Sequence, residues 1–209
     1  MSYARNVGLS ASEDRIEKLI EARLQPGADK AAIDARIWDL FGEEWAVMFT
    51  DLSGFSRDVA SFGIIHFMQI IYESQRILIP CIDQYDGILL KVEGDSMLVI
   101  FRKAGKALAC AVAMQKSCND YSRDREAAEQ IRLCVGIGAG RVLRIGDRDV
   151  YGSEVNAAAK LGEDHAKAGE ILVTDAVRIA TADDIYSFKP IDAVPPGAKS
   201  AFQLVNKNG

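Results

Sequence analysis

Two aspartates, Asp51 and Asp95, stand at positions where carboxylates could bind metal ions. Asp51 ends the largely apolar run 46–50, which is typical of a buried strand, and Asp95 comes shortly before a second apolar run at 97–101. Mg²⁺ and Mn²⁺ take oxygen ligands, so carboxylates at the ends of neighbouring strands can hold these ions and the phosphates that accompany them. The two residues therefore predict a divalent-metal site.

Each polar residue of interest also has a simpler interpretation when it is taken alone. Asp51 and Asp95 are of a type that favours helix N-caps and turns, and Asn156 could equally be a cap. Lys91 and Glu93 alternate along a strand, as at a solvated and salt-bridged edge. The functional interpretation depends on the joint occurrence of these residues.

The segments around the aspartates alternate between strand and helix patterns. We predict strands at 45–50, 88–92, 97–101 and 131–139, and helices around 64–85, where Pro80 kinks or interrupts the helix, and at 104–119. The order βαββαβ predicts an α+β fold of the ferredoxin-like or palm type, with an antiparallel sheet and helices on one face. Asp51 and Asp95 would then lie on adjacent central strands.

The remaining segments complete the predicted domain. A short strand or loop is expected near 142–145, a helix from Ser153 to about His165, and strands near 171–174 and 201–205. Gly136, Gly138 and Gly140 leave room for close approach of another backbone, although they could also mark only a strained strand crossing.

The composition excludes several classes of function. The chain has 209 residues and a net charge of −5, which argues against a nucleic-acid-binding surface. It has no apolar run long enough to span a membrane, and its first residues do not resemble a secretory signal. The four cysteines lack C-x-x-C spacing and fall in apolar stretches, so we expect buried, reduced thiols in the cytoplasm rather than disulfide or metal roles. His66 and His165 have no metal-like spacing and are expected to be structural or surface residues.

Three segments carry a resemblance to a known family. Phe-Thr-Asp-Leu-Ser-Gly-Phe at 49–55, Lys-Val-Glu-Gly-Asp-Ser-Met at 91–97 and Asp-Val-Tyr-Gly-Ser-Glu-Val-Asn at 149–156 resemble three consecutive motifs of the class III nucleotidyl cyclase catalytic domain. The resemblance covers about residues 45–180, in the order and spacing of the family, and it places the motifs at a strand end, a hairpin and a helix start.

The resemblance implies a metal-binding and phosphate-binding half of the site. Asp51, Asp95 and the carbonyl of Leu52 would bind two divalent metal ions, Mg²⁺ or Mn²⁺. The segment Ser53, Gly54 and Phe55 would lead into a helix whose free N–H groups face the substrate phosphates.

The resemblance also implies a half that reads the base. Lys91 would donate to adenine N1 and Asp149 would accept from the adenine amino group, whereas guanylyl cyclases usually carry Glu and Cys at these positions. Asn156 would orient the ribose. Four residues later, where the family generally has an arginine that stabilises the pentavalent phosphorus, this chain has Lys160, which lacks the planar bidentate fork of arginine.

The resemblance predicts a homodimer, because the metal-binding aspartates and the base-reading residues of one site come from different subunits in this family. We expect a domain at 45–209 that converts ATP to cyclic AMP and pyrophosphate. The alternatives are a cyclase that acts on a pyrimidine triphosphate or GTP, and a degenerate nucleotide-binding module. The sequence does not decide which basic residue binds the terminal phosphates, and the candidates are Arg141, Arg144, Lys189 and Lys199.

Residues 1–44 precede the predicted catalytic domain and have a different pattern. Helices are expected at 10–24, where Ser10 and Glu13 resemble a capping box, and at 29–41, after the break at Pro26-Gly27. This helical segment is too short to fold alone. It would pack on its own chain or take a dimerising or regulatory role.

Overall fold

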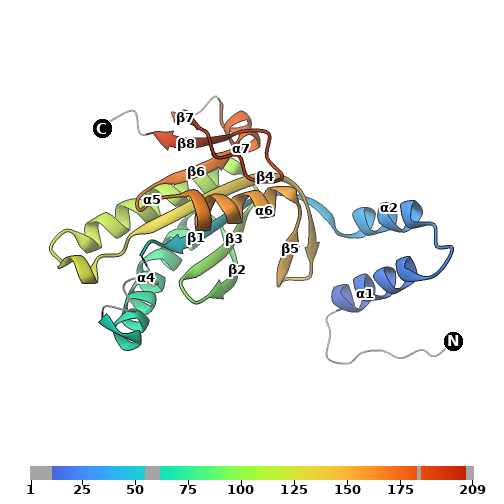
Figure 1. The fold of residues 1–209 in the computed structure, drawn as a ribbon, viewed down its shortest axis with the longest axis horizontal. Helices are drawn as coiled ribbons and strands as arrows, with labels where there is room; N and C mark the ends of the chain where they lie inside the picture. The colour runs from blue at the N-terminus through green and yellow to red at the C-terminus, as the bar shows by residue number, and fades with distance from the viewer. Residues whose placement is uncertain (1–10, 55–61, 183–184, 206–209) are drawn as a thin grey trace.

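The computed structural model describes residues 11–54, 62–182 and 185–205. Over these residues the chain forms one mixed sheet with strands in the order β2-β3-β1-β4-β6-β8-β7, and β5 pairs with the far end of β4 (Figure 1). The strands are β1 (Gly42–Leu52), β2 (Ile88–Glu93), β3 (Ser96–Phe101), β4 (Leu133–Ile145), β5 (Asp149–Tyr151), β6 (Ile171–Thr174), β7 (Ser187–Ile191) and β8 (Ala201–Val205).

The helices are arranged around this sheet. They are α1 (Ala11–Leu24), α2 (Lys30–Phe41), α4 (Ile64–Gln84), α5 (Ala104–Ser122), α6 (Ser153–Lys160) and α7 (Asp175–Ala180), with a 3₁₀ turn at Ala127–Glu129 and a π-helical turn at Leu161–His165. The predicted βαββαβ order is confirmed by β1, α4, β2, β3, α5 and β4. None of the helices in the described residues has the length and apolar character needed to cross a membrane.

The prediction that helices cover only one face of the sheet was wrong. Met48 of β1 and Val99 of β3 face α4 and α5, whereas the alternate residues Val47 and Leu98 belong to a separate cluster with Val155 of α6. Helix α6 therefore covers the opposite face. The sheet is also not purely antiparallel, because β6 pairs with β4 in parallel.

Several boundaries differ from those expected from the sequence. Residues 142–145, expected as a separate strand or loop, continue β4, which then turns back into β5. The α-helix that begins at Ser153 ends at Lys160, and a π-helical turn continues to His165. Pro80 lies inside α4 without ending it. The short elements β5, α7 and β7 were not predicted.

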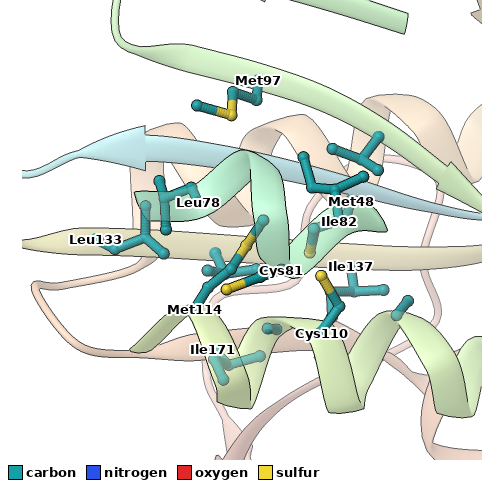
Figure 2. Packing of buried hydrophobic residues seen from close by; sticks show 14 of the residues in the cluster. Met48, Leu78, Cys81, Ile82, Met97, Cys110, Met114, Leu133, Ile137 and Ile171 are labelled. Atoms are coloured by element: carbon teal, nitrogen blue, oxygen red, sulfur yellow. The ribbon is translucent and has the colours of Figure 1, made fainter. Parts of the chain in front are cut away.

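The main core lies between the sheet and helices α4 and α5. Figure 2 shows Met48, Leu78, Cys81, Ile82 and Met114 packed together there, all buried. All four cysteines are free and buried, as predicted. Burial raises the pKa of the Cys110 and Cys118 thiols to about 12, so these side chains are neutral, inert packing groups.

Helices α1 and α2 form an arm, residues 11–41, that lies beside the β4–β5 hairpin, away from α4 and α5 (Figure 1). Arg23 of α1 pairs with Asp34 of α2 through two hydrogen bonds of 2.6 and 3.1 Å. Leu19 and Ile37 of the arm pack on Ile145 at the end of β4. Both predicted helices are confirmed over the described residues, whereas Ser10 of the expected capping box lies outside them. Strand β1 follows α2 directly at Gly42, three residues before the expected strand start at Trp45.

Candidate active site

The two metal-site candidates lie close together at one end of the sheet. Strand β1 pairs with β3 so that Thr50 faces Met97, which places Asp51, near the end of β1, beside the β2–β3 turn that contains Asp95. Ser96 Oγ donates to Asp51 Oδ1 over 3.2 Å. The structure therefore brings together the two aspartates that the sequence singled out.

Asp51 and Asp95 raise each other's electrostatic cost, because two carboxylates lie close together in a half-buried position. Burial and the neighbouring carboxylate of Asp95 raise the pKa of Asp51 to about 6, and burial likewise raises the pKa of Asp95. Within the described residues, neither aspartate forms an ion pair with a lysine or arginine. A divalent ion would offset the negative charge of the two carboxylates, which no lysine or arginine of the described residues pairs with.

The turn after β1 places a glycine where the backbone has a positive φ. Ser53 N donates to the carbonyl of Arg132 over 2.8 Å, and Gly54 has φ of +97°, a conformation that favours glycine. Leu52, which precedes Ser53, is buried. Phe55 and the expected helix start behind it lie outside the described residues.

The predicted base-reading residues meet in a second cluster. Lys91 of β2 donates to Asp149 of β5, with 2.8 Å between Nζ and Oδ2, although the two residues are 58 positions apart in the chain. This hydrogen bond is the main reason that the pKa of Lys91 is raised. Tyr151 Oη also donates to Asp149 Oδ2, over 3.2 Å.

A cavity of about 340 Å³ joins this pair to Asn156. Phe49 and Val155 contribute apolar lining, and Glu93, Ser96 and Glu163 contribute polar lining. Among the described residues, the lining includes neither Asp51 nor Asp95. The Lys91–Asp149 pair and the Asp51–Asp95 pair are therefore neighbouring groups, and Ser96 connects them because it lines the cavity and donates to Asp51.

Helix α6 carries Asn156 and is seated unusually close to the sheet. A Cβ added at Gly136 would lie 2.1 Å from the Ala158 carbonyl oxygen, and one at Gly138 would lie 2.3 Å from the Glu154 carbonyl oxygen. The predicted close backbone approach at these glycines is therefore confirmed. Glu154 fastens the helix further, because its carboxylate accepts from Ala139 N over 3.0 Å and from Thr174 Oγ1 over 2.7 Å.

Lys160 lies four residues beyond Asn156, on the same exposed side of α6. Its Nζ is 2.6 Å from Asp164 Oδ2 in the following π-helical turn, with both side chains about half exposed. The hydrogen bond from Lys160 lowers the pKa of Asp164. The cation that stands in place of the expected arginine is thus held by a carboxylate of its own chain.

Two of the four basic candidates for the terminal phosphates have partners within their own chain. Arg141 donates to the carbonyl of Trp38 over 3.0 Å, and Arg144 donates to Asp147 over 2.9 Å. Among the described residues, neither these arginines nor Lys189 and Lys199 line the cavity that holds Asn156. The choice among the four stays a prediction.

Sequence reasoning missed four residues around the site. Ser96 was quoted only as part of a motif, yet it contacts Asp51, and Tyr151 contacts Asp149. Glu154 looked like an ordinary helix residue, and Glu163 lines the cavity that contains Asn156 from the π-helical turn. The positions of Tyr151 and Glu163 depend on the β4–β5 hairpin and on the π-helical turn, which no local pattern indicates, whereas Ser96 and Glu154 lie on predicted elements and only their contacts were missed.

Comparison with known proteins finds a family match over most of the chain. Residues 42–201 match the family described as the adenylate and guanylate cyclase catalytic domain. The chain belongs to this family. The matched residues run from Gly42 of β1 to Ala201 of β8, so the arm of α1 and α2 lies outside them.

Curated relatives of the cyclase domain are much longer proteins. The chain is 28% identical over 159 residues to "Serine/threonine-protein kinase pkn2" of Myxococcus xanthus, which covers 76% of this chain and 19% of the relative. It is 29% identical over 152 residues to "Putative adenylate cyclase 3" of Rhizobium meliloti, which covers 73% of this chain and 25% of that protein. The chain thus spans about a fifth to a quarter of the length of these relatives.

Solved structures share the fold of the cyclase domain. The adenylate/guanylate cyclase/hydrolase from Silicibacter pomeroyi superposes with a TM-score of 0.69 at 27% identity and covers 79% of this chain and 98% of that one. The adenylyl cyclase CyaB from P. aeruginosa and the guanylyl cyclase Cya2 share the fold at 20% and 18% identity, with TM-scores of 0.66 and 0.65. They cover 80% and 79% of this chain and 96% and 93% of their own. Because both substrate types occur among the neighbours, the fold alone does not choose the base.

The carboxylates of Asp51 and Asp95 are oxygen ligands, which suit the divalent ions that this family generally uses. Within the described residues, no group of three or more His, Cys, Asp or Glu side chains is placed to hold a metal ion. Two carboxylates leave most coordination positions open, as in sites where Mg²⁺ retains water and binds substrate phosphates. The cyclase domain therefore offers a fitting but incomplete site, which backbone oxygens and a triphosphate could complete.

Proposed function

We propose that the chain is a metal-dependent cyclase that converts ATP to 3′,5′-cyclic AMP and pyrophosphate at the interface of a homodimer. The observation that carries the proposal is the contact between Lys91 and Asp149 beside Asn156. A cationic donor and an anionic acceptor side by side suit adenine, which presents an acceptor at N1 and a donor at its amino group. Guanine presents the opposite pattern.

In this reaction the protein mainly has to position the 3′ oxygen against the α-phosphorus and to neutralise the charge of the triphosphate. The 3′ oxygen of the ribose attacks the α-phosphorus in line and loses its proton, while the bond from that phosphorus to the bridging oxygen breaks and pyrophosphate leaves. Divalent ions bound at Asp51 and Asp95 would lower the pKa of the 3′ hydroxyl and offset the triphosphate charge. Asn156 would hold the ribose, and Lys160 would face the developing charge on the phosphorus.

A homodimer is part of the proposal because, in the family that the chain resembles, the metal-binding and base-reading residues of one site come from different subunits. The base-reading cavity is lined by Lys91, Asp149 and Asn156 but, among the described residues, by neither aspartate of the metal pair. In a head-to-tail dimer the metal pair of one protomer faces the base-reading cavity of its partner, which gives two equivalent sites. The four buried free thiols suit a reducing compartment, so we place the enzyme in the cytoplasm.

The test is a comparison of the four nucleoside triphosphates. Purified protein with Mn²⁺ should release cyclic AMP and pyrophosphate from ATP, with lower kcat/KM for GTP, CTP and UTP. Asp95→Asn should abolish the reaction, and Asp83→Asn, at an exposed position of α4, should leave it unchanged. A preference for CTP, UTP or GTP would overturn the assignment of the base, and no turnover of any triphosphate would overturn the activity.

One observation favours a second candidate, a nucleotide-binding module without turnover. Lys160 is paired with Asp164 at 2.6 Å rather than left free to meet a phosphate. A module of this kind would bind ATP tightly and form no product, and Lys160→Arg would not restore activity. Product formation by the native chain would exclude it.

A further inference from the structure

A second cavity lies between the arm and the β4–β5 hairpin, outside the metal pair. Its volume is about 780 Å³, within the roughly 300–1,000 Å³ range of small-molecule sites. Helix α1 contributes Ile16 and Ile20, helix α2 contributes Ile37 and Trp38, and the end of β4 contributes Leu143 and Ile145. The arm is therefore not simply packed onto the cyclase domain, but encloses space with it.

The charges around this cavity are paired with one another. Arg23 binds Asp34 at 2.6 Å, and Lys91 binds Asp149 at 2.8 Å. Arg148, at the tip of the hairpin, lies 4.0 Å from Glu13 of α1. A charged ligand would have to break one of these pairs, whereas an uncharged ligand would meet isoleucine, leucine and aromatic side chains. The chemistry of the lining thus selects a neutral, largely apolar molecule.

The two cavities share a wall. Lys91, Asp149 and Tyr151 line the arm cavity and also the cavity that contains Asn156. Hydrogen bonds connect these three side chains, because Asp149 Oδ2 accepts from both Lys91 Nζ and Tyr151 Oη. A molecule on one side of this wall therefore touches the same side chains that would read the base on the other side.

We infer that the arm cavity is a regulatory site for an uncharged, largely apolar small molecule, and that its occupancy alters how Lys91 and Asp149 hold the base. The first part stands on the cavity alone, and the second rests on the proposed function. Coupling follows if the ligand favours one arrangement of the shared wall over another, and it must then act in both directions.

Binding is tested with the full chain and a neutral apolar fluorophore, N-phenyl-1-naphthylamine. Its emission should rise saturably with the native protein, and Ile20→Trp, which fills the cavity from an exposed position on α1, should weaken binding at least tenfold. The matched control is Leu24→Trp, one turn further along α1 and outside the lining, which should bind as the native chain does. Ile16→Trp repeats the test should Ile20→Trp lower the melting temperature.

Two results would overturn the assignment of the site. One is unchanged probe affinity in both cavity-filling variants, which would place the probe elsewhere. The other is probe affinity that falls as protein concentration rises, which would show that a segment of a second copy fills the cavity. Neither measurement depends on turnover, so failure of the cyclase proposal leaves this test intact.

Coupling is tested by repeating the titration with nucleotide and by measuring activity with the probe. Saturating probe should change KM for ATP several-fold with little change in kcat, and ATP should change the probe affinity by the same factor as the probe changes the affinity for ATP. Equal probe affinity with and without ATP would overturn the regulatory part and leave only a binding cavity. Leu24→Trp should retain the full coupling.

Discussion

Lys91 Nζ lies 2.8 Å from Asp149 Oδ2, so the donor and the acceptor proposed to read the base satisfy each other before a base arrives. The side chain of Lys91 is 39% exposed and that of Asp149 is 27% exposed. Because solvent reaches this ion pair, the contact is weak enough to be replaced by contacts with a ligand. A base that presents an acceptor and a donor side by side could replace both halves of the pair at once, whereas a mismatched base would leave charged groups unpaired.

The first prediction concerns this exchange. Lys91→Ala should lower kcat/KM for ATP about 10- to 100-fold, because loss of one discriminating hydrogen bond to a charged group costs about 1.5–3 kcal/mol. It should also narrow the difference between ATP and GTP. Steady-state kinetics with both nucleotides measures the effect, and Lys116→Ala, at an exposed position of α5, is the control. Equal losses for ATP and GTP would mean that Lys91 does not read the base.

The second prediction concerns the stability cost of the metal pair. Burial and Asp95 raise the pKa of Asp51 to about 6, so the folded protein takes up a proton more readily than the unfolded chain. The favourable contribution of the protonated form is complete below about pH 4 and is lost as the pH rises through about 6. Metal-free Asp51→Asn should therefore be more stable than the native chain at pH 7.5, by about 1 kcal/mol after solvent screening, and this gain should shrink towards pH 4.

Added cations should reverse that order. Mn²⁺ at neutral pH should raise the melting temperature of the native chain, because an ion that binds only the folded state stabilises it. Asp51→Asn should show little such rise, and Asp83→Asn should behave as the native chain does. Thermal unfolding with and without Mn²⁺ at several pH values checks both statements, and an equal Mn²⁺ response in Asp51→Asn would remove this residue from the metal site.

How far the sequence could predict the site depends on how local each signal is. Asp51 and Asp95 follow from short strand and hairpin patterns, and their juxtaposition follows from the order βαββαβ. The contact of Lys91 with Asp149 could not be derived from any pattern, since it joins residues 58 positions apart through a hairpin that was expected only as a short strand or loop. Only the family resemblance paired these two positions.

The faces of the sheet show the same limit. Gly136 and Gly138 predicted that another backbone segment lies close to strand β4. The sequence did not predict which segment this is or which face of the sheet it covers. The segment is helix α6, on the face of the sheet opposite α4 and α5. Its alanines are small enough to pack against the glycines of β4. The cavity between the arm and the β4–β5 hairpin could not be predicted either, because it depends on where the arm packs.

The third prediction concerns the lysine that replaces the expected arginine. Lys160 shares its charge with Asp164 at 2.6 Å, so Asp164→Asn should free the ammonium group and raise kcat several-fold with little change in KM. Lys160→Arg should raise kcat as well, because its planar fork can bind a carboxylate and a phosphate oxygen together. Asp120→Asn, which breaks the exposed contact with Arg123 on α5, is the control and should leave kcat unchanged. A fall in kcat in Asp164→Asn would show instead that this carboxylate positions Lys160 productively.

The fourth prediction concerns the seat of α6. Gly138→Ala would place a methyl group 2.3 Å from the Glu154 carbonyl oxygen, where the backbone cannot yield without moving the helix. We expect a loss of about 3 kcal/mol or more in the free energy of unfolding, at the upper end for an overpacked core. Gly152→Ala is the matched control, since its new methyl group would meet neighbours no closer than 3.4 Å. Urea denaturation measures both, and a native-like midpoint for Gly138→Ala would mean that α6 is less tightly seated than its contacts indicate.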